Sequence, residues 1–223
     1  MGKILGLTAL ACLGMAQHAA AVNVLANPTF ATDLSGWTVA NSAGFGTTTF
    51  DGALDANSNP ASGSAETVAQ FTGAGETGVF LQQCYETPTP GATYSYSGSV
   101  FIPGNQPTSG SGIVLVSFFN QPGCSAGFLS SSNQLTSTVG AWTLLTGSVV
   151  APPGTQSIWF TFQTSKTQAG GNFQVNYDNA ELDGPSPTTV SVPTLSFHGT
   201  LLLAALLCAA AAVYARRRRA RRP

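Results

Sequence analysis

The part of the chain between its two ends has almost no basic residues and no histidine. Of 223 residues only two are histidines, and both, His18 and His198, lie in the terminal segments. Lys166 is the only base in residues 22–215, and all nine acidic residues lie between Asp33 and Asp183. The net charge of that part is therefore −8. Such a surface repels the phosphates of DNA and RNA, which excludes nucleic acid as a partner.

The same shortage excludes most catalytic chemistry. Without histidine or arginine in residues 22–185, the chain cannot build a Ser-His or Cys-His pair there, and it lacks zinc ligands. A pair of carboxylates, as in glycoside hydrolysis, is the catalytic arrangement that is left, and we keep a hydrolase as a remote alternative. The acids available for such a pair are Asp51, Asp55, Glu66, Glu76 and Glu86. Because the spacing of these acids singles out no pair, we predict that the protein is not an enzyme.

Long apolar runs occur only at the two ends of the chain. Residues 1–21 have the layout of a secretory signal peptide, with Lys3, an apolar run and small residues at Ala19–Ala21. We expect signal peptidase to cleave after Ala21; the alternative is a short N-terminal helix that stays on the protein.

The C-terminal apolar run, residues 195–215, is long enough to cross a bilayer as a helix. The arginines that follow it should stay in the cytoplasm and leave the body of the protein outside; the alternative is a basic tail that binds nucleic acid. These stop residues are Arg216, Arg217, Arg218 and Arg219.

Four cysteines are present, and two of them, Cys12 and Cys208, fall in the terminal segments. The remaining pair, Cys84 and Cys124, would meet an oxidising compartment after export, where we expect them to form a disulfide. On the chain-entropy model a bridge across a loop of about 40 residues stabilises by about 4 kcal/mol. The alternative is two unpaired buried thiols.

Alternation of apolar and polar side chains predicts short β-strands throughout residues 22–184. In Thr93–Ile102, for example, Tyr94, Tyr96, Val100 and Ile102 fall on one face. A last strand runs from Phe173 to Leu182 with a bulge at Asp178–Asn179, since its apolar residues slip by one position there. Other strands are predicted at Trp37–Val39, Thr67–Phe71, Val79–Gln83, Ile113–Phe119, Trp142–Val150 and Ser157–Gln163.

With no convincing amphipathic helix among them, these strands indicate an all-β fold, an antiparallel β-sandwich. The predicted organisation is a signal peptide, a sandwich domain, a Pro/Ser/Thr linker, a transmembrane sorting segment and a cytoplasmic tail. Their ranges are 1–21, 22–184, 185–194, 195–215 and 216–223.

The C-terminal motif resembles the IPTL-CTERM sorting signal of Gram-negative bacteria. The motif is followed by the apolar run and the arginines, in the order of that family, with Val192 in place of Ile and His198 in place of Trp. The resemblance implies recognition by an exosortase-type enzyme and anchoring in the inner membrane before transfer to the cell surface or outside; the alternative is an ordinary single-pass anchor. The motif residues are Val192, Pro193, Thr194, Leu195, Ser196 and Gly199.

The middle of the chain resembles carbohydrate-binding modules of the family four and nine type, which are jelly rolls of the galactose-binding-like fold. The matching segments are Leu25–Phe30, Gly36–Trp37, Leu81–Gln83, Pro90–Tyr96 and Val175–Leu182. The resemblance implies a jelly-roll sandwich more than a ligand.

Members of that family often hold a structural calcium ion. Asp178 matches one of the residues that bind it, but Ala31 stands where another acid is expected. Calcium binding and no cofactor at all therefore stay open as alternatives.

Sugar binding needs flat apolar faces beside hydrogen-bonding side chains. Trp159 is the strongest candidate, because its position in the strand turns it away from Ile158 and Phe160; Tyr85 and Phe101 are weaker ones. Trp37 and Trp142 are expected in the core. We therefore expect an exported surface protein that binds a glycan without catalysis. The alternative is a structural or adhesive protein of the surface or extracellular matrix without a sugar site.

Overall fold

The computed structural model describes residues 22–40, 45–71 and 77–185. The predicted signal peptide, the sorting motif, the apolar segment 195–215 and the arginine tail lie outside these residues. Within the described ranges no helix combines the length and the apolar character that a membrane crossing requires.

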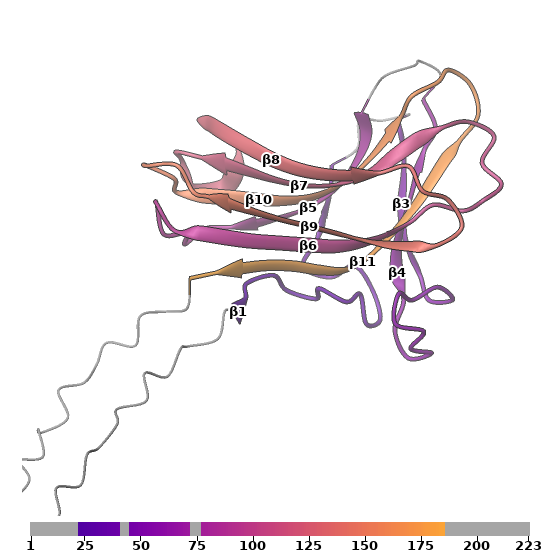
Figure 1. Cartoon of the computed structure of the whole chain (residues 1–223), viewed down its shortest axis with the longest axis horizontal. Coiled ribbons are helices and arrows are strands. Elements are labelled where there is room, and N and C mark those ends of the chain that lie inside the picture. Colours follow the sequence, from indigo (N-terminus) through magenta and orange to yellow (C-terminus); the bar gives the residue numbers. More distant parts are fainter. Residues whose placement is uncertain (1–21, 41–44, 72–76, 186–223) are drawn as a thin grey trace, which may run out of the picture. The chain divides into compact units, whose positions relative to one another are not determined.

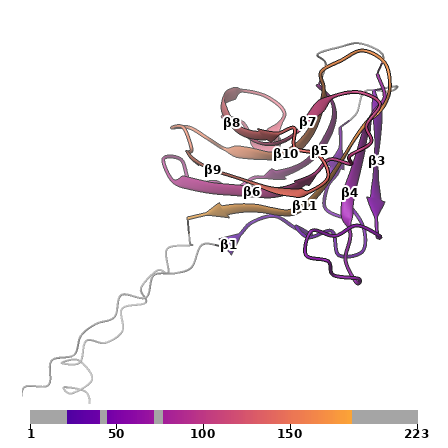
Figure 2. The ribbon, with the colours of Figure 1, turned by 45° about the vertical axis from the view of Figure 1, so that its right-hand side comes forward.

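The described residues form two antiparallel sheets (Figures 1 and 2), so the predicted all-β antiparallel jelly-roll sandwich is confirmed. Figure 1 shows β8, β7, β10 and β5 in one layer, above β9, β6 and β11. One sheet contains, in spatial order, β3 (Gly46–Asp51), β4 (Ser64–Ala69), β11 (Phe173–Gly184), β6 (Thr93–Phe101) and β9 (Trp142–Val150), with β1 (Val22–Asn23) also on β11. The other contains β2 (Thr38–Val39), β5 (Thr77–Tyr85), β10 (Ser157–Lys166), β7 (Gly110–Phe119) and β8 (Phe128–Thr136).

Aromatic rings fill the space between the sheets. Phe162 of β10 stacks on Tyr177 of β11, with ring centroids 4.6 Å apart. Trp37 packs on Phe162 at 5.7 Å and on Phe160 at 5.9 Å. Trp37 thus belongs to the core, as predicted, and the inner faces of both sheets are the apolar faces that strand periodicity indicated.

The predicted bulge in the last strand is confirmed. The pairing of β11 with β6 shifts register between Asp178 and Glu181. Asn179, inside the bulge, has a φ of 48°, in the left-handed region that Asn tolerates better than most residues. The bulge restores Ala180 and Leu182 to the buried side of the strand.

Two strands and one core residue differ from the prediction. The sequence patterns did not indicate β3 or β8, each of which stands at one edge of its sheet and is rich in Thr or Ser. Edge position is not the reason, since β2 and β9 are also edge strands and were predicted; the polar composition of β3 and β8 leaves little apolar alternation to detect. Trp142 is not in the core: it pairs with Phe101 on the outer face of the six-stranded sheet and is half-buried, because it has the same strand phase as exposed Leu144.

Candidate functional site

The outer face of the five-stranded sheet carries no exposed charge. The only charged residue in its five strands is Lys166, whose buried Nζ donates to the carbonyl oxygens of Phe71 and Gly171. On β10 the core side holds Ile158, Phe160 and Phe162, so Trp159, Thr161 and Gln163 face outward. These residues are the centre of a surface that we call the neutral face.

Register places the other members of the neutral face around β10. In an antiparallel ladder, directly paired residues share one face of the sheet. On one side Gln82 pairs with Thr161 and Phe80 with Gln163. On the other side the partners of Trp159, Thr161 and Gln163 are Ser117, Leu115 and Ile113, and β8 adds Ser131, Asn133 and Leu135. The neutral face therefore combines apolar side chains with hydroxyl and amide side chains across four strands.

One end of the neutral face is aromatic. The ring of Trp159 meets that of Phe119 edge-on, with centroids 5.3 Å apart. Phe119 meets Phe128 in the same manner at 6.0 Å. Phe128 is 61% exposed although it is a large apolar side chain. Three rings thus run in a row from β10 to β8, which is the kind of apolar platform on which a sugar ring packs.

Three polar side chains of the neutral face are shielded and make few or no hydrogen bonds. Gln82, Ser117 and Gln163 are each only 8% exposed. Within the described ranges, no hydrogen bond engages the Gln163 carboxamide or the Ser117 hydroxyl, and Gln82 only donates weakly to Thr161 Oγ1 at 3.3 Å. Thr48 Oγ1 is the only fully enclosed side-chain polar atom without a partner in those ranges. The free groups of the neutral face therefore still reach solvent, where a ligand can replace water.

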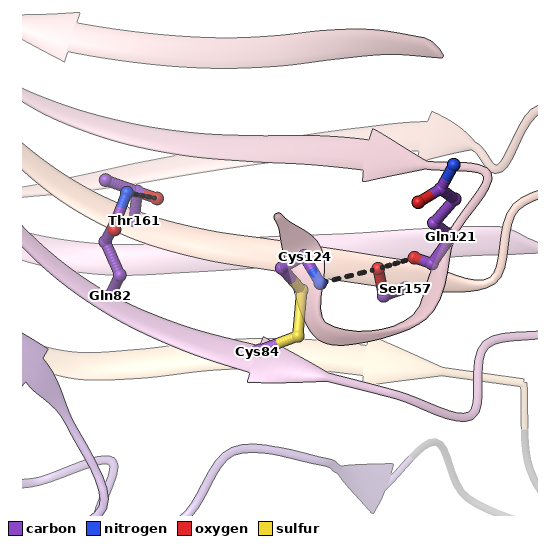
Figure 3. The surroundings of a disulfide bond; sticks show 6 residues. All are labelled: Gln82, Cys84, Gln121, Cys124, Ser157 and Thr161. Atoms are coloured by element: carbon purple, nitrogen blue, oxygen red, sulfur yellow. Dashed lines mark hydrogen bonds between the residues drawn. A yellow bond between two sulfur atoms is a disulfide. The ribbon is translucent and has the colours of Figure 1, made fainter. Parts of the chain in front are cut away.

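A disulfide bounds the neutral face at the end that holds Trp159, and Figure 3 shows this bridge with Ser157 and Gln121 near it. Cys84 and Cys124 are bonded, with Cα atoms 6.0 Å apart, which confirms the predicted bridge. Cys84 pairs with Trp159 in the ladder, and Cys124 lies in the short 3₁₀ turn η1 (Pro122–Cys124). The Ser157 hydroxyl accepts from Cys124 N at 3.1 Å and donates to Gln121 O at 2.6 Å. These bonds hold η1 against the start of β10.

The outer face of the six-stranded sheet is acidic and already satisfied. Its strands hold five carboxylates, those of Asp51, Glu66, Asp178, Glu181 and Asp183. Asn176 donates to Asp51 Oδ2 and Ser64 Oγ, Gln174 donates to Glu66 Oε2, and Ser97 donates to Glu181 Oε2. Burial raises the pKa of Glu66, and the neighbouring Asp51 carboxylate raises it further. On this surface, unlike the neutral face, most polar side chains are hydrogen-bonded to one another.

Asp178, the predicted calcium ligand, lies on that acidic face. Its Oδ2 accepts from Ala56 N at 2.9 Å and its Oδ1 from Asn179 N at 2.7 Å. Burial raises the pKa of Asp178 to about 6, against the lowering effect of these two bonds. In the described ranges no three acidic, His or Cys side chains are grouped as metal ligands. Since Ca²⁺ takes six to eight oxygen ligands, this donor set fits the ion poorly, and calcium binding stays a prediction.

The three predicted sugar contacts lie on three different surfaces. Trp159 is on the neutral face. Tyr85 pairs with Ile158, so it lies on the core side of its sheet, where its ring is 6.5 Å from that of Tyr94. Phe101 lies on the acidic face, against Trp142 at 5.5 Å. The structure therefore does not bring the three together.

Sequence reasoning missed the polar half of the neutral face. Gln163 has the same strand phase as Trp159, so the argument that selected the tryptophan could have selected this amide too. Gln82 has the phase of Cys84, but only strand pairing reveals that it lies beside β10. No local signal marks Phe119 and Phe128 as neighbours of Trp159.

No family model matches the chain, and no curated protein sequence matches it. Solved structures do resemble it, and most of those found are carbohydrate-binding modules. The enzymatically active domain of tailspike protein 4 from bacteriophage CBA120 is 18% identical with a TM-score of 0.53; the match covers 72% of this chain and 21% of that one, so this chain spans about a fifth of the phage protein.

A putative sugar binding protein from Bacteroides thetaiotaomicron is 10% identical with a TM-score of 0.51, and the match covers 73% of this chain and all of that one. A family 16 carbohydrate-binding module is 14% identical with a TM-score of 0.49, over 72% of this chain and 99% of that one. Identities this low establish a shared fold and do not identify a ligand.

Proposed function

We propose that the protein is a non-catalytic carbohydrate-binding protein and that the neutral face is its binding surface. The observation that carries this proposal is the row of three aromatic rings, of which Phe128 is exposed and Trp159 half-buried, on the same face as the Gln163 carboxamide and the Ser117 hydroxyl, which have no hydrogen-bond partner in the described ranges. A sugar offers both apolar C–H faces and hydroxyls, and so complements both halves of this surface. The jelly-roll fold shared with a putative sugar binding protein supports the proposal.

A glycan array with the purified full-length protein tests this proposal. We expect binding to at least one glycan and a loss of about tenfold or more in affinity in Trp159→Ala, because an aromatic platform contributes over 1 kcal/mol. Gln163→Ala should weaken the same interaction. Trp142→Ala is the matched control, since it removes a half-buried tryptophan from the acidic face. Unchanged binding in Trp159→Ala, or equal losses in both tryptophan variants, would refute the assignment.

The alternative is an adhesive or structural surface protein without a sugar site, and one observation favours it. Of the large apolar side chains that are exposed, five lie in β8, β9 and their connection: Phe128, Leu135, Val139, Leu144 and Val150. Phe128 and Leu135 lie on the neutral face and Leu144 and Val150 on the acidic face, so each outer face offers exposed apolar side chains for contact with another protein or with extracellular matrix. Absence of any glycan on the array, together with matrix retention that survives Trp159→Ala, would select this alternative.

We further propose that the chain is exported, anchored in the inner membrane and then delivered to the cell surface or outside. The signal-like residues 1–21, the motif 192–199 and the arginines that follow the apolar run support this. Fractionation of cells with and without the exosortase-type enzyme tests it. Cytoplasmic recovery of an uncleaved chain would contradict export, and identical sorting without the enzyme would contradict the sorting motif.

The calcium prediction has its own test. If Asp178 holds the ion, added Ca²⁺ raises the melting temperature of the wild type and leaves that of Asp178→Asn unchanged. Equal melting temperatures with Ca²⁺ and with a chelator in the wild type would exclude a structural calcium ion.

A further inference from the structure

A pocket of about 290 Å³ lies at one end of the sandwich, away from the disulfide. Three connections line it: β6–β7 with Gly104, Gln106 and Ser109, β8–β9 with Ser137, and β10–β11 with Thr167. Segments more than sixty residues apart in sequence therefore meet there. The proposed carbohydrate surface does not use this pocket.

Hydrogen bonds between the connections hold the pocket in shape. The Gln106 carboxamide donates to Gln174 O at 3.0 Å and accepts from Gln174 N at 3.1 Å, as an added strand would. Thr167 N donates to Ser109 O at 2.9 Å, and Gly140 N donates to Ile102 O at 2.7 Å. A pocket whose walls are fixed in advance costs little ordering entropy when a ligand enters.

The hydroxyl groups of the pocket retain hydrogen-bonding capacity. Thr167 Oγ1 donates to Ser109 O at 3.0 Å, so in the 3.0 Å contact between the two hydroxyls Ser109 is the donor and Thr167 the acceptor. The acceptor positions of Ser109 Oγ are then open. Ser137 and Ser111 share one hydrogen bond of 3.0 Å in which either hydroxyl can donate. The pocket thus offers acceptors, and it offers the Ser137 proton as a donor when Ser111 donates the shared bond.

One side of the pocket is apolar. Phe173 borders it but is only 1% exposed, so the ring forms part of the apolar wall and presents no open aromatic face. Val139, at the rim, is 53% exposed. Every lining residue is uncharged, and neighbouring Lys166 directs its ammonium to two backbone carbonyls instead. Neither an anion nor a cation finds a charged partner here.

We propose that this end pocket is a second binding site, which takes one uncharged, hydroxyl-bearing unit of about monosaccharide size. Its volume is at the small end of ligand pockets, which start at about 300 Å³. An uncharged pocket that combines an apolar side with hydroxyl groups fits a sugar ring better than a fatty or an ionic ligand. The unit can be a free monosaccharide or the end residue of a longer glycan. The proposal is independent of the neutral face.

Amide chemical shifts of the full-length protein in detergent micelles test it, with neutral methyl glycosides of hexoses and pentoses as probes and the matching disaccharides as a second set. We expect shifts at Gln106, Thr108, Ser137 and Thr167 for at least one methyl glycoside, with millimolar affinity. Shifts there with disaccharides alone would mean that the site recognises a glycan end. No shifts at these residues with either set would overturn the proposal.

Gly104→Tyr is the blocking variant, because a Cβ at Gly104 meets nothing within 4 Å and a side chain can project into the pocket without disturbing the fold. Ser148→Tyr, on exposed β9, is the matched control. The shifts should vanish in Gly104→Tyr and persist in both Ser148→Tyr and Trp159→Ala. Shifts that survive Gly104→Tyr would refute the site. Shifts confined to the neutral face would refute the end pocket alone, and leave the proposed function standing.

Discussion

At the scale of single residues, burial raises the pKa of several carboxylates of this domain. Asp178 accepts two backbone N–H groups, yet burial still raises its pKa to about 6. Burial also raises the pKa of Glu66 and that of Asp183, whose neighbour Glu181 adds to the effect. Exposed Asp33 behaves in the opposite way, since the Ser35 hydrogen bonds lower its pKa.

The raised pKa of Asp178 predicts an unusual pH dependence. A carboxyl whose folded pKa lies above its unfolded value stabilises the fold fully below the unfolded pKa, and this stability is lost as pH rises through the folded pKa near 6. The melting temperature should therefore rise as pH falls from about 7.5 to about 5. Asp178→Asn should reduce that slope. Calorimetry across this range checks it, and an equal slope in the variant would contradict the assignment.

A glycine in the middle of β6 predicts a steric effect. A Cβ at Gly98 would lie 2.5 Å from the ring of Phe162, between the sheets. We expect Gly98→Ala to destabilise the domain by about 1–3 kcal/mol, because an overpacked core forces side chains or backbone to move. Gly104→Ala, where the added methyl meets nothing within 4 Å, should be close to neutral. Urea denaturation of both variants measures the difference, and similar midpoints would contradict the tight contact.

At the scale of elements, η1 is the piece that connects stability to the binding surface. It has only three residues, so it cannot hold its place through its own backbone bonds. The disulfide to β5 and the two bonds of Ser157 fix it at the end of β10. The aromatic end of the neutral face therefore has a rigid border.

Removal of the disulfide should change both the stability of the domain and ligand binding at the neutral face. The Cys84→Ser, Cys124→Ser double variant should lose about 4 kcal/mol of unfolding free energy, as the chain-entropy model gives for a loop of this length. Binding to the neutral face should weaken as well, since η1 loses a tether beside Trp159. Denaturation and glycan titration below the melting temperature test the two effects. A variant that binds as the wild type does would show that the border is not needed.

At the scale of the whole molecule, the charged side chains are unevenly distributed over the domain. Residues 87–165 contain no charged side chain, and they supply β6, β7, β8, β9 and most of β10. Five of the nine carboxylates lie instead on β3, β4 and β11 of the six-stranded sheet. The neutral face and the end pocket are thus lined by uncharged residues in a domain whose net charge is −8.

This uneven distribution predicts that glycan binding does not depend on salt. Affinity at the neutral face should be unchanged between about 50 mM and about 500 mM NaCl, because no ion pair is available to be screened there. Isothermal titration at several salt concentrations measures it. A large drop in affinity with added salt would place the ligand on the acidic face.

The sequence by itself determined the class of fold, the positions of the inner strands and the cysteine pair. Period-two alternation is a local property, and the central strands display it because one of their faces is buried in the core. The bulge at Asp178–Asn179 was also readable, since it leaves a slip in that same period. The strands β3 and β8 were not, because their residues are mostly polar and show little apolar alternation, whereas β9, which is also an edge strand, was readable.

Only the tertiary structure decided which of these residues share a surface. Gln82 and Trp159 are 77 positions apart in the chain, and only the register of β5 against β10 puts them on one face. Phase alone indicated that Trp159 faces away from the core, but it could not show that Phe101 and Tyr85 lie elsewhere. Pairing between distant strands follows from packing the whole chain at once, so no local pattern records it.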